Sequence, residues 1–97
     1  MKNKNSFQSR LSQIEEKINH RQYKEALDLL ESIYIENSDD LHINLLIGEM
    51  HITIGQYRES EKYFRNAMKI EPGHYQALYG LGKVNYSYQA GPKFMHR

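Results

Sequence analysis

The chain has 97 residues, a formal net charge of +1 and no cysteine. This length makes one small domain, and the charge gives no electrostatic reason to expect nucleic acid or an anionic membrane as partner. The absence of cysteine excludes a disulfide scaffold, thiol catalysis and thiolate metal sites. No apolar run resembles a signal peptide or approaches the roughly 20 residues of a membrane span. We therefore expect a cytoplasmic protein.

Apolar residues recur at helical spacing along the chain, which predicts five helices after a disordered segment at residues 1–6. The first, third and fifth helices are expected at about residues 7–19, 41–54 and 74–89, and the second and fourth carry apolar stripes from Tyr23 to Tyr34 and from Tyr57 to Met68. The polar segment 37–40 is expected to end one helix and cap the next. Later breaks are expected at Gly55, at Glu71-Pro72-Gly73 and at Gly91-Pro92, before a tail at residues 91–97. No strand signal occurs, so the predicted class is all-α.

The chain also matches itself at a step of 34 residues. Residues 7–40 align without a gap with residues 41–74, and residues 75–90 begin a third copy that stops after its first helix. The clearest match places Gln22-Tyr23-Lys24-Glu25-Ala26 opposite Gln56-Tyr57-Arg58-Glu59-Ser60. A fixed period of this size is typical of stacked helical units, each of which buries its apolar face on its neighbour.

Residues 41–74 resemble the tetratricopeptide repeat over their whole length. The matching positions are Ile47-Gly48 in the first helix and Ser60, Phe64, Ala67 and Pro72 in the second. Asn44 and His51 stand where the family prefers large aromatic residues, and the copy at 7–40 is more degenerate, with Ile14 in place of glycine and Ser38 in place of proline. The third copy keeps Leu78 and Leu81-Gly82.

The resemblance implies a short right-handed α-solenoid of two full helix pairs plus one helix, and a protein–protein interaction module or adaptor as its function. Small residues are expected where helices approach closely: Gly48, Gly82, Ala26, Ser60 and Ala67. Leu78, Leu81 and Gly82 are expected to pack on the preceding helix pair. A shorter stretch, residues 74–82, is similar to Cdc27-type scaffold subunits of the anaphase-promoting complex.

In this family the first helix of each pair faces a concave groove, which is the usual ligand site. The period carries three positions of each copy onto that face: Leu11, Leu45 and Tyr79; Glu15, Glu49 and Lys83; Ile18, Ile52 and Tyr86. Two apolar rows then flank a charged row, so we expect the groove to take apolar or aromatic side chains of a partner protein or peptide, with a basic group near the glutamates. The alternative is that these residues mostly pack on neighbouring first helices.

Chaperone-binding members of the family hold a C-terminal carboxylate with a clamp of lysine, asparagine and arginine. The clamp positions here are Leu11, Glu15, Leu46, Gln76 and Gly80, none of which matches. The C-terminal tails of Hsp70 and Hsp90 are therefore not expected ligands.

Tyr75, Tyr79 and Tyr86 fall within about 40° of one another on the last helix, so they form one stripe. Three interpretations stay open. The last helix caps the array, or it leaves an open flank through which a structural scaffold segment forms a homodimer, or the chain is a piece of a longer array.

Catalytic and metal-binding patterns are missing. The five histidines share no metal-ligand spacing, no nucleophile stands beside a base, and Gly80-Leu81-Gly82-Lys83 lacks the strand and the spacing of a phosphate loop. We expect neither a cofactor nor a metal, and we do not expect an enzyme.

Overall fold

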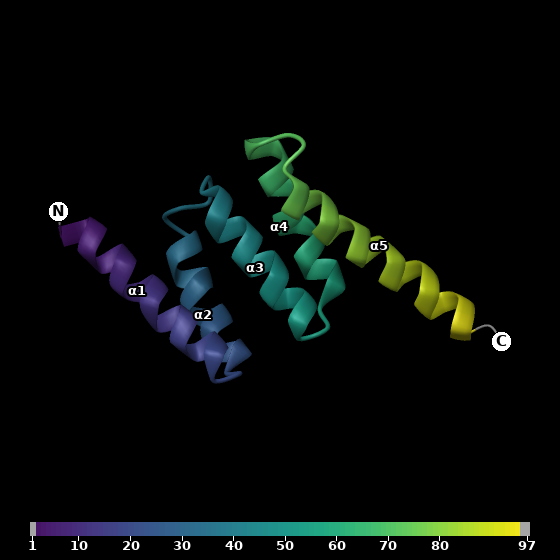
Figure 1. Cartoon of the computed structure of the whole chain (residues 1–97), viewed down its shortest axis with the longest axis horizontal. Coiled ribbons are helices and arrows are strands. Elements are labelled where there is room, and N and C mark those ends of the chain that lie inside the picture. Colours follow the sequence, from purple (N-terminus) through teal and green to yellow (C-terminus); the bar gives the residue numbers. More distant parts are fainter. Residues whose placement is uncertain (1, 96–97) are drawn as a thin grey trace.

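The computed structural model describes the backbone of residues 2–95 and the side chains of residues 8–86. Within that range it contains α1 (Lys2–Asn19), α2 (Tyr23–Tyr34), α3 (Leu41–Thr53), α4 (Tyr57–Ile70) and α5 (Tyr75–Met95), shown in Figure 1. Residues 2–95 contain no strand. The predicted all-α class is confirmed.

Helices that follow one another along the chain pack on one another, and α3 also packs on α5. In Figure 1, α2 lies behind α1 and α4 lies behind α5. The molecule is elongated, with extents of 56 × 31 × 19 Å. Within the described residues, α1 packs on α2 alone, whereas α3 has three helical neighbours. The third helix is therefore the centre of the fold.

Two helices extend beyond the ranges that the sequence predicts. The first begins at Lys2, within the segment expected to be disordered, and α5 continues through Gly91-Pro92 to Met95. Residues 2–6 contain no apolar residue, so apolar spacing gives no signal for helix there. Proline fixes φ near −65°, which a helix accepts with the loss of one backbone hydrogen bond. The prediction that Gly91-Pro92 ends the fifth helix is wrong.

The turns between the helices follow the predicted local chemistry. The Asp40 carboxylate accepts a hydrogen bond of 2.9 Å from the backbone N–H of Ile43 and so caps α3. Gly55 follows α3 with a φ of 84°, and Gly73 follows α4 with a φ of 83°. Both values lie in the left-handed region that glycine adopts without strain. The roles predicted for the 37–40 segment and for Gly55 are confirmed.

Two hydrophobic clusters hold the helices together, and α3 contributes to both. The largest fully buried side chains of the first cluster come from α1, α2 and α3: Ile14, Leu30, Ile33, Ile43 and Ile47. The second cluster joins α3, α4 and α5 through Leu45, Phe64, Ala67 and Ala77. The two ends of the molecule are thus linked through the middle helices.

The tip of the Phe64 ring lies between α3 and α5, where a glycine on each helix leaves room for it. A Cβ added at Gly48 would lie 2.8 Å from Phe64 Cζ, and one added at Gly80 would lie closer still. Gly82, the close-packed glycine that the repeat predicts for the fifth helix, has no heavy atom within 4 Å of an added Cβ. That prediction is wrong, and Gly80 takes the role.

The physical reason is that residues 2–95 include no second helix of the third copy. Gly48 packs on α4, which is the second helix of its own copy. No such helix follows α5 within residues 2–95, so Gly82 faces solvent. Leu78 is 50% exposed for the same reason, and only Leu81 of the face predicted to pack does so. The fifth helix instead buries Ala77 and Val84 completely.

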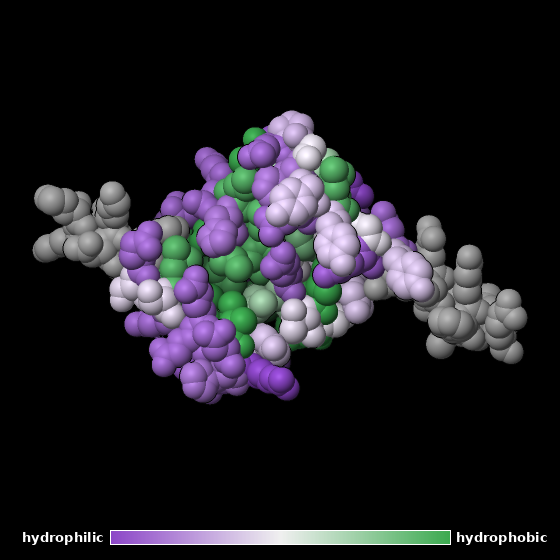
Figure 2. Space-filling model, viewed as in Figure 1, coloured by the Kyte–Doolittle hydropathy of each residue, from purple (hydrophilic) through white to green (hydrophobic). Residues whose placement is uncertain are grey.

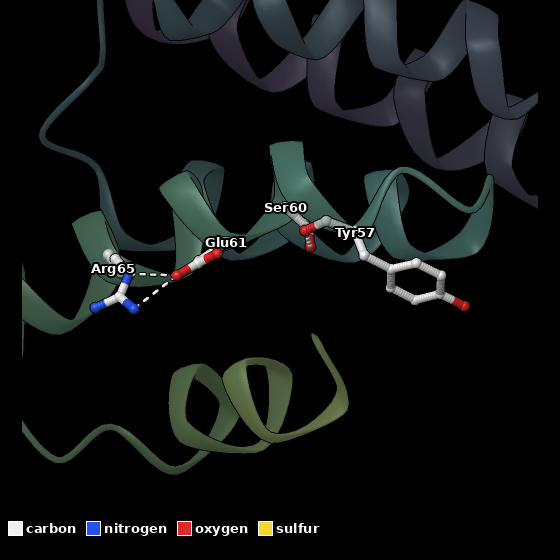
Figure 3. A network of polar contacts seen from close by, with 4 residues as sticks. All are labelled: Tyr57, Ser60, Glu61 and Arg65. Atoms are coloured by element: carbon white, nitrogen blue, oxygen red, sulfur yellow. Dashed lines mark hydrogen bonds and ion pairs between the residues drawn. The ribbon is translucent and has the colours of Figure 1, made fainter. Parts of the chain in front are cut away.

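The other small residues lie where the repeat predicts. Ala26, Ser60 and Ala67 are fully buried. Figure 3 shows the polar contacts along α4: the Ser60 hydroxyl donates to the Tyr57 carbonyl at 2.7 Å, and Arg65 donates to Glu61 from Nε at 2.8 Å and from Nη2 at 2.6 Å. An exposed pair at this spacing adds roughly 0.3–0.5 kcal/mol to the helix.

Candidate partner-binding cleft between α3 and α5

A cleft of about 250 Å³ opens between α3 and α5. Glu49, Ile52 and Thr53 line it from α3, and Gln76, Tyr79 and Lys83 line it from α5. Figure 2 shows hydrophobic side chains along the middle of the face on which these two helices lie. The cleft therefore combines apolar surface with ionisable groups on both walls.

The apolar part of the cleft is continuous with the protein core. Phe64 reaches the cleft from α4 and is fully buried, so its ring forms part of the floor. Ile52 is partly buried and packs against the second cluster while also lining the cleft. A rigid floor of this kind favours a bound apolar side chain, because such a group leaves water without displacing core residues.

The charged groups of the cleft stand on opposite walls. Lys83 Nζ lies 4.6 Å from the centroid of the Tyr79 ring, a cation–π contact. Glu49 is partly buried and belongs to none of the ion pairs among side chains 8–86. A partly buried carboxylate attracts a cation more strongly than one in bulk water, because solvent screens it less. The α3 wall thus offers a position for a basic group.

Four of the nine residues that the sequence places on the concave face line this cleft: Glu49, Ile52, Tyr79 and Lys83. They come from corresponding helices of consecutive copies. The first-copy residues lie elsewhere, because the described residues of α1 do not pack on α3. Leu11 and Ile18 are partly buried against the first cluster, and Glu15 is exposed.

The last two predicted residues lie outside the cleft for opposite reasons. Leu45 is 6% exposed and packs in the second cluster, so it presents little surface to a partner. For Leu45 the packing alternative describes the structure. Tyr86 is 73% exposed but does not line the cleft.

Sequence reasoning missed several residues of the lining. Gly80 corresponds to Leu46 and Ser12 in the other copies, so the repeat period carries no signal for a glycine there. Its role depends on the Phe64 ring, which approaches from α4. Thr53 lines the cleft and donates its hydroxyl to the Glu49 carbonyl at 2.9 Å. This hydrogen bond stabilises the last turn of α3.

Outside the cleft, a cluster of polar side chains joins α2, α3 and α4 around His51, which is 5% exposed. Its Nδ1 lies 2.8 Å from Gln56 Oε1, and its Nε2 lies 3.9 Å from Glu31 Oε2. The ring stacks on Tyr63 with centroids 5.6 Å apart. These contacts fix how three helices cross. In the part of the chain that the structure describes, no group of three or more metal-ligating side chains stands close enough to hold an ion.

The helices described by the structure include none that is both long and apolar enough to cross a bilayer. Comparisons with protein-family models, with curated proteins and with solved structures give no match. The resemblance to the tetratricopeptide repeat therefore depends on the residues of this chain alone.

Proposed function

We propose that this chain is a tetratricopeptide-like interaction module, a short right-handed α-solenoid in which the cleft between α3 and α5 binds a peptide or helix of a partner protein. The observation that carries the proposal is the convergence of Glu49, Ile52, Tyr79 and Lys83 on one cleft. The family resemblance and the repeat period together predict these residues, and the residues come from two helices that are 34 residues apart in the sequence.

The chemistry of the cleft indicates the kind of partner. A volume of about 250 Å³ is below the roughly 300–1,000 Å³ of small-molecule sites, so protruding polypeptide side chains fit better than a cofactor. The floor at Ile52 and Phe64 suits an apolar or aromatic side chain. The Glu49 carboxylate suits a neighbouring lysine or arginine. The proposed ligand is a segment with one apolar residue beside a basic one.

The proposal assigns no catalytic role. The hydroxyls that line the cleft belong to Thr53 and Tyr79, and no histidine lines it to act as a base. The cysteine-free sequence suits a reducing compartment, and we place the protein in the cytoplasm on that ground.

The test is selection of peptides from a displayed random library on the immobilised intact chain. Affinity for one selected peptide is then measured by isothermal titration with three variants. Ile52→Asp and Glu49→Lys should each weaken binding at least about tenfold, which is about 1.4 kcal/mol. The first change places a charge on the apolar floor, and the second repels the basic group of the ligand.

The control is Ile35→Asp, because Ile35 is 81% exposed and lies outside the cleft. It should bind the peptide like the unmodified chain. Circular dichroism verifies the helicity of each variant. Wild-type affinity in a correctly folded Glu49→Lys chain would exclude the cleft as the binding site.

A further inference from the structure

The outward face of α5 carries a stripe that no other described part of the chain covers. We define the tyrosine stripe as Tyr75, Tyr79, Gly82 and Tyr86. The three tyrosines are 75%, 67% and 73% exposed, and the space beside Gly82 is open. Figure 2 shows a row of pale, weakly hydrophilic side chains that runs across the viewed face from its centre toward the right, where α5 lies in Figure 1. Exposed aromatic surface of this kind marks an interface.

The residues of the tyrosine stripe are spaced like those of a helix that packs side by side with another helix. Its members follow one another at intervals of four, three and four residues, and they lie within about 60° of the helix circumference. These intervals are those of the a and d positions of a heptad, the positions that meet when two helices pack side by side. Ala77 and Val84, which are fully buried, lie on the opposite side of α5. The body of the chain therefore leaves the stripe open to a second helix.

We propose that the tyrosine stripe is a homodimer interface in which α5 packs antiparallel on α5 of a second copy. In antiparallel pairs an a position meets a d position. Tyr75 then meets Tyr86 of the second copy, and Tyr79 meets Gly82 of the second copy. Both pairings share one midpoint, between residues 80 and 81, so one register satisfies them together. The open space at Gly82 receives the ring of Tyr79.

A parallel pair fits less well. It would place Gly82 opposite Gly82 and leave a void in the interface, which destabilises a contact. The single small residue of the stripe, Gly82, thus favours the antiparallel arrangement, in which it meets Tyr79.

Charge also favours a second copy as the occupant. Lys83 is the only charged residue between positions 75 and 86, and it stands beside the stripe with its ammonium over the Tyr79 ring. In the antiparallel register the two Lys83 positions are about 8 Å apart along the helix axis, and each faces Gln76 of the second copy. No like charges meet, and the neutral stripe offers no complement to a charged partner.

The area of the stripe is sufficient for a weak dimer. A tyrosine presents about 200 Å² of surface, so the exposed fractions together with part of Leu78 give about 500 Å² per copy. Two copies bury about 1,000 Å², which is near the lower limit of specific interfaces. We therefore expect association in the micromolar range.

The homodimer does not depend on the proposed function of the cleft. Tyr75 and Tyr86 belong to the stripe but do not line the cleft, whereas Ile52 and Glu49 line the cleft but lie on α3. The dimer would cover Tyr79, Lys83 and Gln76, which also line the cleft. Tyr75→Glu should therefore abolish dimerisation and leave unchanged the peptide affinity measured below the concentration at which the chain dimerises. Ile52→Asp should weaken peptide binding and leave dimerisation unchanged. A failure of one proposal is therefore distinguishable from a failure of the other.

The first experiment is sedimentation equilibrium of the intact chain from about 5 to 500 μM. The mass should rise with concentration toward twice that of the monomer. Tyr75→Glu and Tyr86→Glu should each remain monomeric, because a charge enters the apolar contact. Ile35→Glu, which changes an equally exposed apolar residue away from α5, should dimerise like the unmodified chain. A wild-type chain that stays monomeric at about 500 μM overturns the proposal.

The second experiment tests the direction of the helices by oxidative cross-linking. The chain has no cysteine, so an introduced thiol reports on one position. In the antiparallel register, identical positions at 75, or at 86, are about 16 Å apart along the axis, which is beyond the reach of a disulfide. Tyr75→Cys alone and Tyr86→Cys alone should stay uncross-linked, and an equal mixture of the two should form a covalent dimer. Cross-linking within each variant alone, or none in the mixture, overturns the antiparallel arrangement.

Discussion

Tyr63 on α4 shows how one buried side chain is held by neighbours from two other helices. It is 8% exposed, its ring stacks on His51, and it meets the Tyr34 ring edge to face with centroids 5.3 Å apart. Burial raises the pKa of Tyr63 above its ordinary value of 10.0, and the nearby Glu31 and Tyr34 raise it further. All three causes disfavour the phenolate.

The raised pKa of Tyr63 predicts how stability depends on alkaline pH. Above about pH 10 the unfolded chain loses this proton before the folded chain does. The contribution of Tyr63 to stability is therefore complete below pH 10.0 and is lost as the pH rises through the folded pKa. Urea unfolding of Tyr63→Phe should show a smaller loss of stability between about pH 9 and pH 11 than the unmodified chain.

The matched control for Tyr63→Phe is Tyr75→Phe, because Tyr75 is 75% exposed. It should follow the wild-type pH dependence. Equal losses in all three chains would show that burial of Tyr63 contributes nothing to the alkaline transition.

At the scale of a single element, the rotation of α5 about its own axis decides which of its glycines is packed. The ring of Phe64 occupies the space where a Cβ at Gly80 would stand, while Gly82 faces open space. The two positions are one half-turn apart on the same helix. Glycine to alanine can therefore be tested at a packed position and at an open position of one helix.

Gly80→Ala should lower the free energy of unfolding by about 1–3 kcal/mol, because a fully buried ring must move. Gly82→Ala should raise it by up to about 1 kcal/mol, because alanine is the better helix former and meets no neighbour. Thermal unfolding at about 1 μM, below the concentration range of the proposed dimer, measures both. Effects of the same sign in the two variants would contradict this orientation of α5.

The same element shows what the sequence could and could not predict. The 34-residue step and the turn residues were sufficient to locate the central parts of five helices and the cap at Asp40. They assigned the packed face of α5 incorrectly, because the repeat pattern assumes that each first helix has its own second helix beside it. Gly82 and Leu78 would be buried under such a helix, and within residues 2–95 none is present.

For the candidate site, the period identified the positions that belong on one face but not the spacing between helices. Glu49, Ile52, Tyr79 and Lys83 meet because α3 packs directly on α5. Leu11 and Ile18 occupy equivalent positions but stay apart from them, because among the described residues α1 packs on α2 alone. Helix spacing depends on side chains from a third element, and a sequence pattern within one helix does not contain that information.

At the scale of the whole molecule, the order of helix contacts predicts the order of local opening. In the part of the chain that the structure describes, α1 has one helical neighbour and α3 has three. In a linear array, stability is close to a sum of contacts between neighbours, so a terminal unit opens at a lower free energy than a central one. Hydrogen exchange followed by mass spectrometry should show the fastest amide exchange in α1 and the slowest in α3.

Two core variants test this order. Ile14→Ala removes a fully buried side chain from α1 and should speed exchange in α1 and α2 while leaving α4 unchanged. Ile47→Ala makes a comparable change in α3 and should speed exchange in all helices that pack on it. Uniform acceleration in both variants would mean that the chain opens as a single cooperative unit.

The position of the Phe64 ring has a consequence for how this molecule can vary over evolution. The ring stands between Gly48 and Gly80 and so sets the distance between the two walls of the cleft. Substitutions at this one site on α4 would change the width of the cleft, while those at Glu49 or Lys83 would change its charge. The shape of the cleft and its charge thus depend on separate residues on separate helices, and a change of shape at Phe64 also requires the core around it to repack.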